Sequence, residues 1–244
     1  MTNKADQKYW DKYHAGFELQ IAPVIHPIRQ LIEEPFPKTD NKTCIEIGCY
    51  PGAFLAVFGE LGYKLYGIDL SENTEMLPEW SKSQNYSVGE FWKDDFLKFN
   101  PGHKFDVVSS FGFIEHFTNW EEILLKHMEL VDDNGYLFVE VPNFIGLFQN
   151  ILHKYFDRTN YDHHHIPSMD IEKWVTILTN GNFKILYKEC FGPFYYWVDH
   201  QDRNIIQRGF LKSLRKISPS LRRILPEDKK AYSPFAGAIA QKLG

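Results

Sequence analysis

The sequence predicts an α/β fold in which helices cover a mostly parallel β-sheet. Between residues 43 and 143, short apolar runs alternate with helical patterns, and this alternation is typical of parallel strands joined by crossover helices. The chain has 244 residues, of which 43% are hydrophobic and 24% charged, so its length and composition are those of one globular domain. No apolar run approaches the roughly 18 residues of a transmembrane helix, so none is predicted.

The predicted elements follow one another regularly in the middle of the chain. Short apolar runs predict five strands, over residues 43–48, 64–69, 86–91, 105–110 and 136–141, the last of which is stopped by Pro142. The patterns between them predict helices over residues 54–61 and 120–131. Further along we expect a helix over 170–179 and strands over 183–190 and 235–240.

Two stretches without clean periodicity interrupt this order. We therefore expect a single domain with a helical lead-in, a core and two insertions, with the boundaries 1–40, 41–141, 142–167, 168–191, 192–233 and 234–244. The lead-in carries the aromatic pair Tyr9-Trp10, which is ordinary packing or part of a lid over a ligand.

Charge and cysteine content exclude several classes of protein. The net charge of -5 argues against a general nucleic-acid binder, and three cysteines do not make a disulfide framework. The N-terminus does not resemble a secretory signal, so a cytoplasmic protein is expected. Residues 203–230 hold nine lysines and arginines against two acids. This basic run is a solvated helix face, or it meets an anionic acceptor or an anionic membrane surface.

A glycine-containing turn follows the first predicted strand. Gly48 permits a tight turn from strand to helix, and Gly52 lets a ligand approach the start of the helix. The second strand ends in Asp69, whose carboxylate can accept two hydrogen bonds from a ribose diol. The pattern therefore indicates a nucleotide-like ligand at the carboxyl ends of these strands.

Five ordered segments resemble the motifs of the class I S-adenosylmethionine-dependent methyltransferases. They are Glu46-x-Gly48-x-x-x-Gly52, Tyr66-Gly67-Ile68-Asp69-Leu70-Ser71, Lys93-Asp94-Asp95-Phe96, Phe105-Asp106-Val107-Val108 with Ile114-Glu115-His116-Phe117, and Asp133-Asn134-Gly135-Tyr136-Leu137-Phe138-Val139. The resemblance implies a Rossmann-like three-layer sandwich with a mostly parallel seven-stranded sheet and a last antiparallel strand. It also implies S-adenosylmethionine as cofactor and S-adenosylhomocysteine as product.

The resemblance assigns cofactor contacts to this chain. The glycine turn suits the methionine end, where Tyr50 adds a ring at a position that is often glycine in the family. Leu70 and Phe96 can enclose the adenine, while Asp95, or Asp94 beside it, accepts a hydrogen bond from its amine. The predicted cofactor-binding residues are Glu46, Gly48, Tyr50, Gly52, Asp69, Leu70, Asp95, Phe96, Ser110 and Phe111.

Two histidines are candidates for the base of the reaction. Backbone around Ser110 and Phe111 should border the transferred methyl group, because ligands of such sheets lie at the carboxyl ends of the strands. His116 follows the same strand, and His165 belongs to the triplet over residues 163–165 in the first insertion. A neutral imidazole can take the proton of a hydroxyl acceptor. His116 can equally be a buried residue bonded to the backbone, and part of the triplet can be simply solvated.

No metal site is predicted. Adjacent histidines point in different directions and rarely bind one ion together. The ubiquinone-biosynthesis O-methyltransferases resemble this chain through Glu115-His116 and hold a divalent ion with a further acid, whose place is taken here by Gly112.

These observations predict a methyltransferase that acts on a small polar acceptor. A hydroxyl is the favoured group, on a sugar, a nucleotide-linked sugar or another metabolite, and the basic run admits an anionic acceptor. The segment Ser109-Ser110-Phe111-Gly112 lacks the Asn/Asp-Pro-Pro-aromatic motif of nucleic-acid amino-methyltransferases. The alternative is a module that binds S-adenosylmethionine without catalysis. An NAD-dependent dehydrogenase fits less well because the G-x-G-x-x-G spacing is missing. The sequence leaves the acceptor and the oligomeric state open.

Overall fold

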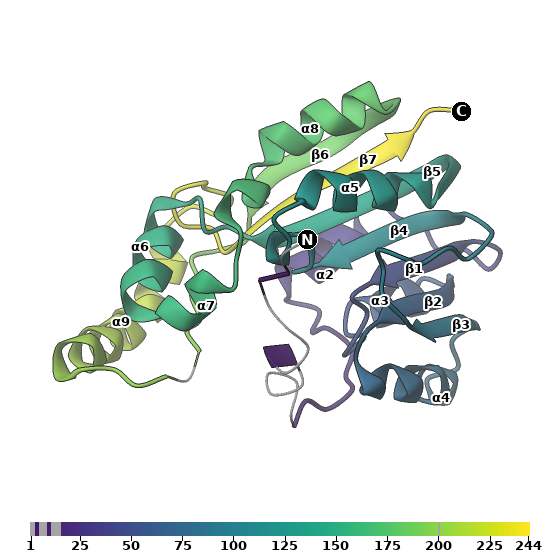
Figure 1. Ribbon diagram of the computed structural model, residues 1–244. Helices are drawn as coiled ribbons and strands as arrows, with labels where there is room; N and C mark the ends of the chain where they lie inside the picture. The colour runs from purple at the N-terminus through teal and green to yellow at the C-terminus, as the bar shows by residue number, and fades with distance from the viewer. Residues whose placement is uncertain (1–2, 5–8, 11–15, 200) are drawn as a thin grey trace.

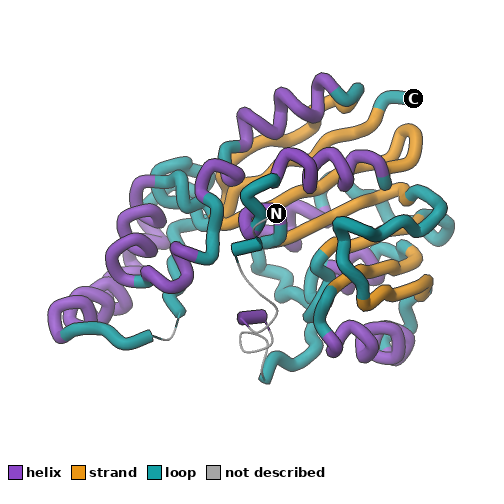
Figure 2. The backbone as a smooth tube through the Cα atoms, in the orientation of Figure 1, coloured by secondary structure: helices purple, strands orange, loops and turns teal. Residues whose placement is uncertain are grey.

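Seven strands form one sheet in the order β3-β2-β1-β4-β5-β7-β6 (Figures 1 and 2). This computed structural model describes residues 3–4, 9–10, 16–199 and 201–244. The strands are β1 (Thr43–Ile47), β2 (Lys64–Asp69), β3 (Val88–Lys93), β4 (Phe105–Phe111), β5 (Val131–Pro142), β6 (Phe183–Phe191) and β7 (Phe235–Lys242). β1 to β5 pair in parallel, and β7 runs antiparallel between β5 and β6. The predicted sheet, mostly parallel with a last antiparallel strand, is confirmed.

Helices cover both faces of this sheet (Figure 1). In the described residues they are α2 (Pro27–Glu33), α3 (Leu55–Glu60), α4 (Leu77–Ser83), α5 (Trp120–Glu129), α6 (Leu147–Phe156), α7 (Arg158–Asp162), α8 (Ile171–Asn180) and α9 (Ile205–Ile224). Short 3₁₀ turns occupy Glu72–Met76, Ile114–His116 and Ile166–Met169. α5 and α8 pack on one face, and α2 and α3 pack on the other, which makes the predicted three layers. None of these helices combines the length and hydrophobicity needed to span a membrane.

Alternation along the central strands divides the interior into two cores. Val108 of β4 joins the core under α5 and α8, whereas its neighbour Val107 joins the core under α2 and α3. Leu137 and Phe138 of β5 divide in the same way. This period of two is expected because successive side chains of a strand point to opposite faces. The parallel pairing of β1 to β5 brings the carboxyl ends of these strands to one shared edge of the sheet.

The first insertion contains more regular structure than we predicted from sequence. Residues 142–167 were expected to be irregular, but they include α6, α7 and a 3₁₀ turn. α6 has apolar side chains on opposite sides, with Leu152 buried and Leu147 and Ile151 exposed, and this obscures the helical period. Leu152 packs with Phe194 and Leu214, so α6 and α9 stand together at one end of the molecule (Figure 1).

The described part of the lead-in crosses the carboxyl edge of the sheet. Its regular helix is α2, and the predicted helical character of residues 1–2, 5–8 and 11–15 lies outside the described residues. Asn3 bridges to Phe117, and the Lys4 amide donates to the carbonyl of His116 at 2.8 Å. Trp10 packs edge-on against His116, with ring centroids 4.7 Å apart. The lead-in therefore reaches the segment that follows β4.

Candidate active site

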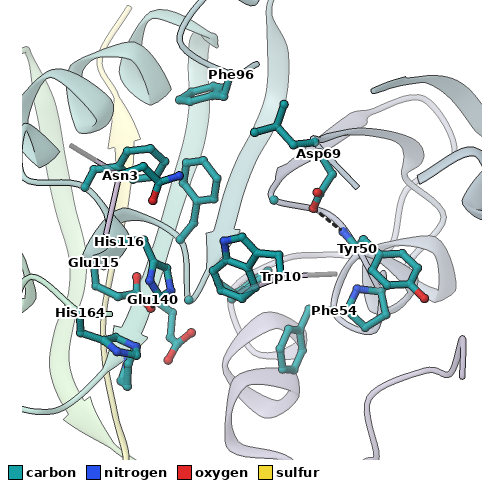
Figure 3. A pocket seen from close by; sticks show the side chains of 18 of the residues that line it. Asn3, Trp10, Tyr50, Phe54, Asp69, Phe96, Glu115, His116, Glu140 and His164 are labelled. Atoms are coloured by element: carbon teal, nitrogen blue, oxygen red, sulfur yellow. Dashed lines mark hydrogen bonds and ion pairs between the residues drawn. The ribbon is translucent and has the colours of Figure 1, made fainter. Parts of the chain in front are cut away.

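One cavity of about 540 Å³ lies at the carboxyl ends of β1, β2, β4 and β5. This is the edge at which parallel α/β sheets bind their ligands. Its volume is within the usual range for small-molecule sites, about 300–1,000 Å³. Figure 3 shows Asp69 and Tyr50 on one side of the cavity and a group of acids and histidines on the other, with Trp10 between them.

The turn after β1 has the geometry that its glycines allow. Gly48 and Gly52 adopt positive φ angles of 72° and 85°, which L-residues rarely adopt. A Cβ on Gly48 would lie 2.7 Å from the ring of Phe113, so the backbone approaches that ring closely. The amide of Gly48 donates to the carbonyl of Ile68 at 2.8 Å, which fixes the turn beside the end of β2.

Asp69 ties the turn to the end of β2 (Figure 3). Its Oδ2 accepts the amide of Tyr50 at 3.0 Å, and its Oδ1 accepts the amide of Ser71 at 2.8 Å. Burial raises the pKa of Asp69, and the amides of Ser71 and Tyr50 oppose that shift. A carboxylate has about four acceptor positions and Asp69 lines the cavity, so it can still accept a hydrogen bond from a diol there.

Most of the predicted cofactor residues line this cavity. Those that do are Gly48, Tyr50, Asp69, Leu70, Asp95, Phe96 and Phe111. Asp94 lines it too, so the alternative between the two neighbouring acids remains open. Phe96 and Asp69 both border the cavity (Figure 3), and the enclosure of an adenine by Leu70 and Phe96 stays a prediction.

Three predicted residues, Glu46, Gly52 and Ser110, are not among the described residues that line the cavity. Glu46 is buried, and its pKa is raised by burial and by the nearby Asp69, while an amide hydrogen bond from Leu55 opposes the shift. The carbonyl of Gly52 accepts the amide of Ala56 at the start of α3. Ser110 lies within the sheet between β1 and β5 and is fully buried. Their assignment to cofactor binding stays a prediction.

The other side of the cavity holds two buried histidines and two buried glutamates. His116 Nδ1 lies 2.9 Å from the carbonyl of His163, and its Nε2 lies 3.7 Å from Oε1 of Glu115. Burial lowers the pKa of His116 to about 4 and raises that of Glu115 to about 8. Burial and the proximity of Glu115 also raise the pKa of Glu140. The side chain of His116 is therefore neutral at pH 7.

The structure brings His164 to this cluster instead of the predicted His165. His164 is buried, lines the cavity, and stacks at an angle on His116 with ring centroids 4.7 Å apart. His165 is not among the described lining residues, and its backbone amide donates to the carbonyl of Glu115. His163 turns toward Tyr9, with centroids 4.0 Å apart. The three side chains leave the end of α7 in different directions, so one of them points into the cavity.

Sequence reasoning missed several lining residues. Glu140 lies in an apolar strand segment, and a lone acid there was an available signal of a special environment. Asn160, Trp197 and Phe235 come from segments without any motif, and only the folded chain brings them to the cavity.

Comparison with known proteins identifies the family. A family model described as a methyltransferase domain matches residues 21–188, which is more than half of the chain. The chain belongs to this family, and its motifs and sheet order are those of the class I S-adenosylmethionine-dependent methyltransferases. The predicted cofactor is thus the cofactor of the family to which the chain belongs.

Individual relatives are distant. The chain is 23% identical over 142 residues to a ubiquinone biosynthesis O-methyltransferase from Leptothrix cholodnii and 26% identical over 141 residues to one from Thiobacillus denitrificans. Both matches cover 56% of this chain and 58% of the relative, so the chain spans little more than half the length of these curated relatives.

Solved structures share the fold at low identity. A SAM-dependent methyltransferase from Archaeoglobus fulgidus is 21% identical, with 97% of this chain and all of that chain covered and a TM-score of 0.57. Coclaurine N-methyltransferase bound to N-methylheliamine and SAH is 17% identical, with 88% and 70% covered and a TM-score of 0.55.

The residues present fit S-adenosylmethionine. Asp69 offers carboxylate lone pairs beside a glycine turn whose backbone closely approaches the cavity, which suits a ribose and an amino-acid end. Leu70 and Phe96 border the same space, which suits a flat adenine. These features come from three segments of the chain, the glycine turn, the end of β2 and the segment around Phe96, so the fit does not depend on one motif.

Proposed function

We propose that this protein transfers a methyl group from S-adenosylmethionine to a hydroxyl of a small molecule. The observation that carries the proposal is that one cavity joins the Asp69 side to the cluster of Glu115, His116, Glu140 and His164. An acceptor bound near that cluster would face the cofactor across the cavity. In-line transfer needs this arrangement more than it needs covalent help from the protein.

When bound, S-adenosylmethionine supplies an electrophilic methyl group on a positively charged sulfur. The chain's own residues bind and orient it: Asp69 holds the ribose, and Leu70 and Phe96 enclose the adenine. Trp10 from the lead-in lies between the two sides of the cavity (Figure 3).

His116 receives the acceptor's proton. Because a carbonyl only accepts hydrogen bonds, the contact with the His163 carbonyl makes Nδ1 the protonated nitrogen and leaves a lone pair on Nε2. Burial lowers the pKa of His116 to about 4, so the imidazole is a weak base before the reaction. A hydroxyl oxygen that gains a methyl group becomes strongly acidic, and a weak base then suffices to take its proton.

The lining supports a neutral or positively charged acceptor with an apolar face. The described lining residues include no lysine or arginine, and aromatic rings form much of the lining. A cavity without a basic side chain offers a phosphate group no countercharge, so it argues against the anionic acceptor and the nucleotide-linked sugar considered from sequence. Aromatic side chains such as Trp197 and Phe235 offer flat contact surfaces instead.

The test is a transfer assay with labelled methyl donor and a panel of phenols, neutral sugars and amines. With the best acceptor, His116→Ala should lower kcat by about 10²–10⁴, while the affinity for S-adenosylhomocysteine measured by calorimetry stays unchanged. His165→Ala is the matched control and should retain kcat. Equal kcat values for wild type and His116→Ala at saturating acceptor would remove the histidine base. Cofactor binding without transfer to any acceptor would favour the non-catalytic module.

A further inference from the structure

We propose that Glu115, His116 and His164 form a binding site for one divalent transition-metal ion of the Zn²⁺ or Co²⁺ type. Each residue offers one ligand atom, and the three atoms lie within 4.8 Å of one another. The separation of 3.7 Å between Glu115 Oε1 and His116 Nε2 is already close to the spacing of about 3.4 Å that bonds of about 2.0–2.1 Å produce around a tetrahedral ion.

The backbone prepares both imidazoles as ligands. His116 Nδ1 lies 2.9 Å from the carbonyl of His163, and His164 Nδ1 lies 2.7 Å from the carbonyl of Asn160. Each ring therefore carries its proton on Nδ1 and keeps a lone pair on Nε2. A backbone carbonyl that fixes the tautomer of a histidine in this way is the usual outer contact of a metal ligand.

The acids of the cluster have polar atoms without partners. Oε2 of Glu115 and Oε1 of Glu140 are buried, and neither has a hydrogen-bond partner among the described residues. Buried oxygen atoms in this condition are rare in folded proteins because the loss of water is not compensated. A cation held by Glu115 would compensate it, and Glu140 beside it would add a second negative group.

The site is open on one side. All three proposed ligands line the cavity, so an ion has a path to them and a position that faces the acceptor. With three protein ligands, a fourth position stays free for water or an acceptor oxygen, as in catalytic metal sites. Two imidazoles and one carboxylate suit zinc-like ions better than Mg²⁺ or Ca²⁺, which prefer oxygen ligands.

The sequence predicted no metal because Gly112 stands where the ubiquinone-biosynthesis enzymes have a further acidic ligand. The third ligand arrives from the first insertion instead, because the end of α7 places His164 against His116 (Figure 3). The site itself does not depend on the proposed function. Only its use rests on that proposal, and there the ion replaces the histidine base: with the Nε2 lone pair of His116 bound to the ion, the ion would hold the acceptor oxygen and lower the pKa of its hydroxyl.

The experiment begins with the full chain without an affinity tag, treated with a chelator. Calorimetry with S-adenosylhomocysteine first establishes that the metal-free protein is folded. Titration with CoCl₂, followed by visible absorption, should then show binding of one ion per chain, and ZnSO₄ should displace it while millimolar MgCl₂ does not. Absence of stoichiometric Co²⁺ and Zn²⁺ binding would overturn the proposal.

Variants locate the ion. Glu115→Gln and His164→Gln should each lower the Co²⁺ affinity by at least about 100-fold, since loss of an outer contact alone typically costs about 10- to 100-fold. The control variants are His163→Ala and His165→Ala, which each remove a ring outside the proposed site and leave His164 in place. Both should bind Co²⁺ as the wild type does. A weakened His165→Ala together with an unaffected His164→Gln would overturn the assignment.

The two proposals fail in different ways. Stoichiometric Co²⁺ binding that depends on His164, without transfer to any acceptor, supports the metal site and contradicts the proposed function. Methyl transfer by a chain that binds neither Co²⁺ nor Zn²⁺ supports the function and contradicts the metal site.

Discussion

Asp69 combines a structural and a binding role in one side chain. Its two oxygens hold the amides of Tyr50 and Ser71, so it joins the glycine turn to the end of β2, and it faces the cavity at the same time. The same carboxylate that orders the turn is thus available to a ribose diol, which is why an acid at the tip of the second strand was informative in the sequence.

Asp69→Asn should weaken S-adenosylhomocysteine binding about 5- to 150-fold, which corresponds to about 1–3 kcal/mol for lost charge-assisted hydrogen bonds. An amide has one acceptor oxygen, so it cannot accept both backbone amides and the diol. Calorimetry measures the change. Glu72→Gln is the control, because that exposed carboxylate pairs with Lys93 outside the cavity. Unchanged affinity of Asp69→Asn would exclude Asp69 from the ribose site.

At the scale of elements, Gly62 and Gly102 both adopt positive φ angles, but their surroundings differ. Gly62 follows α3 with a φ of 90°, the left-handed conformation common just beyond a helix, and a Cβ there would lie 1.8 Å from the carbonyl oxygen of Thr39. Gly102 has a φ of 73°, but no atom lies within 4 Å of a Cβ at that position. An alanine at either position would have a strained backbone, but only an alanine at Gly62 would also clash with a neighbouring atom.

Gly62→Ala should lower the free energy of unfolding by about 3 kcal/mol or more, whereas Gly102→Ala should cost about 1–2 kcal/mol from left-handed strain alone. The backbone oxygen of Thr39 cannot rotate away as a side chain would, so α3 and the start of β2 must shift. Urea denaturation of both variants measures the difference. Equal losses would mean that the turn accommodates a methyl group without rearrangement.

α9 is an element whose packing is clear and whose lysines and arginines form no salt bridge with another described residue. A capping box of Asn204 and Gln207 begins the helix, and Leu214 anchors it against α6. Its lysines and arginines are exposed, and none of its residues is among the described residues that line the cavity. The basic run therefore lies outside the described lining of the cavity, and its role stays a prediction.

At the scale of the whole molecule, buried titratable groups couple stability to pH. His127 is fully buried on α5, its Nδ1 contacts the carbonyl of Ile123, and burial lowers its pKa to about 4. The unfolded chain has a histidine pKa of about 6.5, so the unfolded state takes up the proton first as the pH falls. The contribution of His127 is complete above about pH 6.5 and is lost progressively toward pH 4.

Between pH 7.5 and 5.0, His127 should reduce the free energy of unfolding by about 2 kcal/mol. His127→Met keeps a side chain of similar size without a titrating group, so its stability should decline less over this range by that amount. Urea denaturation at several pH values gives the two curves, and shifts from other buried groups cancel in their difference. Parallel curves for wild type and variant would contradict the buried, neutral state of His127.

The sequence by itself determined the sheet, the glycine turn and the place of Asp69 at the edge of the cavity. These features depend on local chemistry: strands alternate with a period of two, Gly48 and Gly52 permit positive φ angles, and Asp69 ends its strand at the ligand-binding edge. Each of these signals is carried by residues close together in the sequence, so it can be recognised without knowing which distant residues are in contact. The sequence did not predict that Glu46 and Ser110 are buried outside the described lining of the cavity. The direction of a side chain near a strand end depends on the layers above and below the sheet.

Only the tertiary structure decided the other side of the cavity. Which histidine of the triplet faces His116 depends on where α7 ends and how the insertion packs on the 3₁₀ turn after β4, and one residue of rotation exchanges His164 for His165. The meeting of Glu115, His116 and His164 also joins segments far apart in the chain. Patterns of neighbouring residues carry no record of such contacts, because the packing of the insertion as a whole creates them.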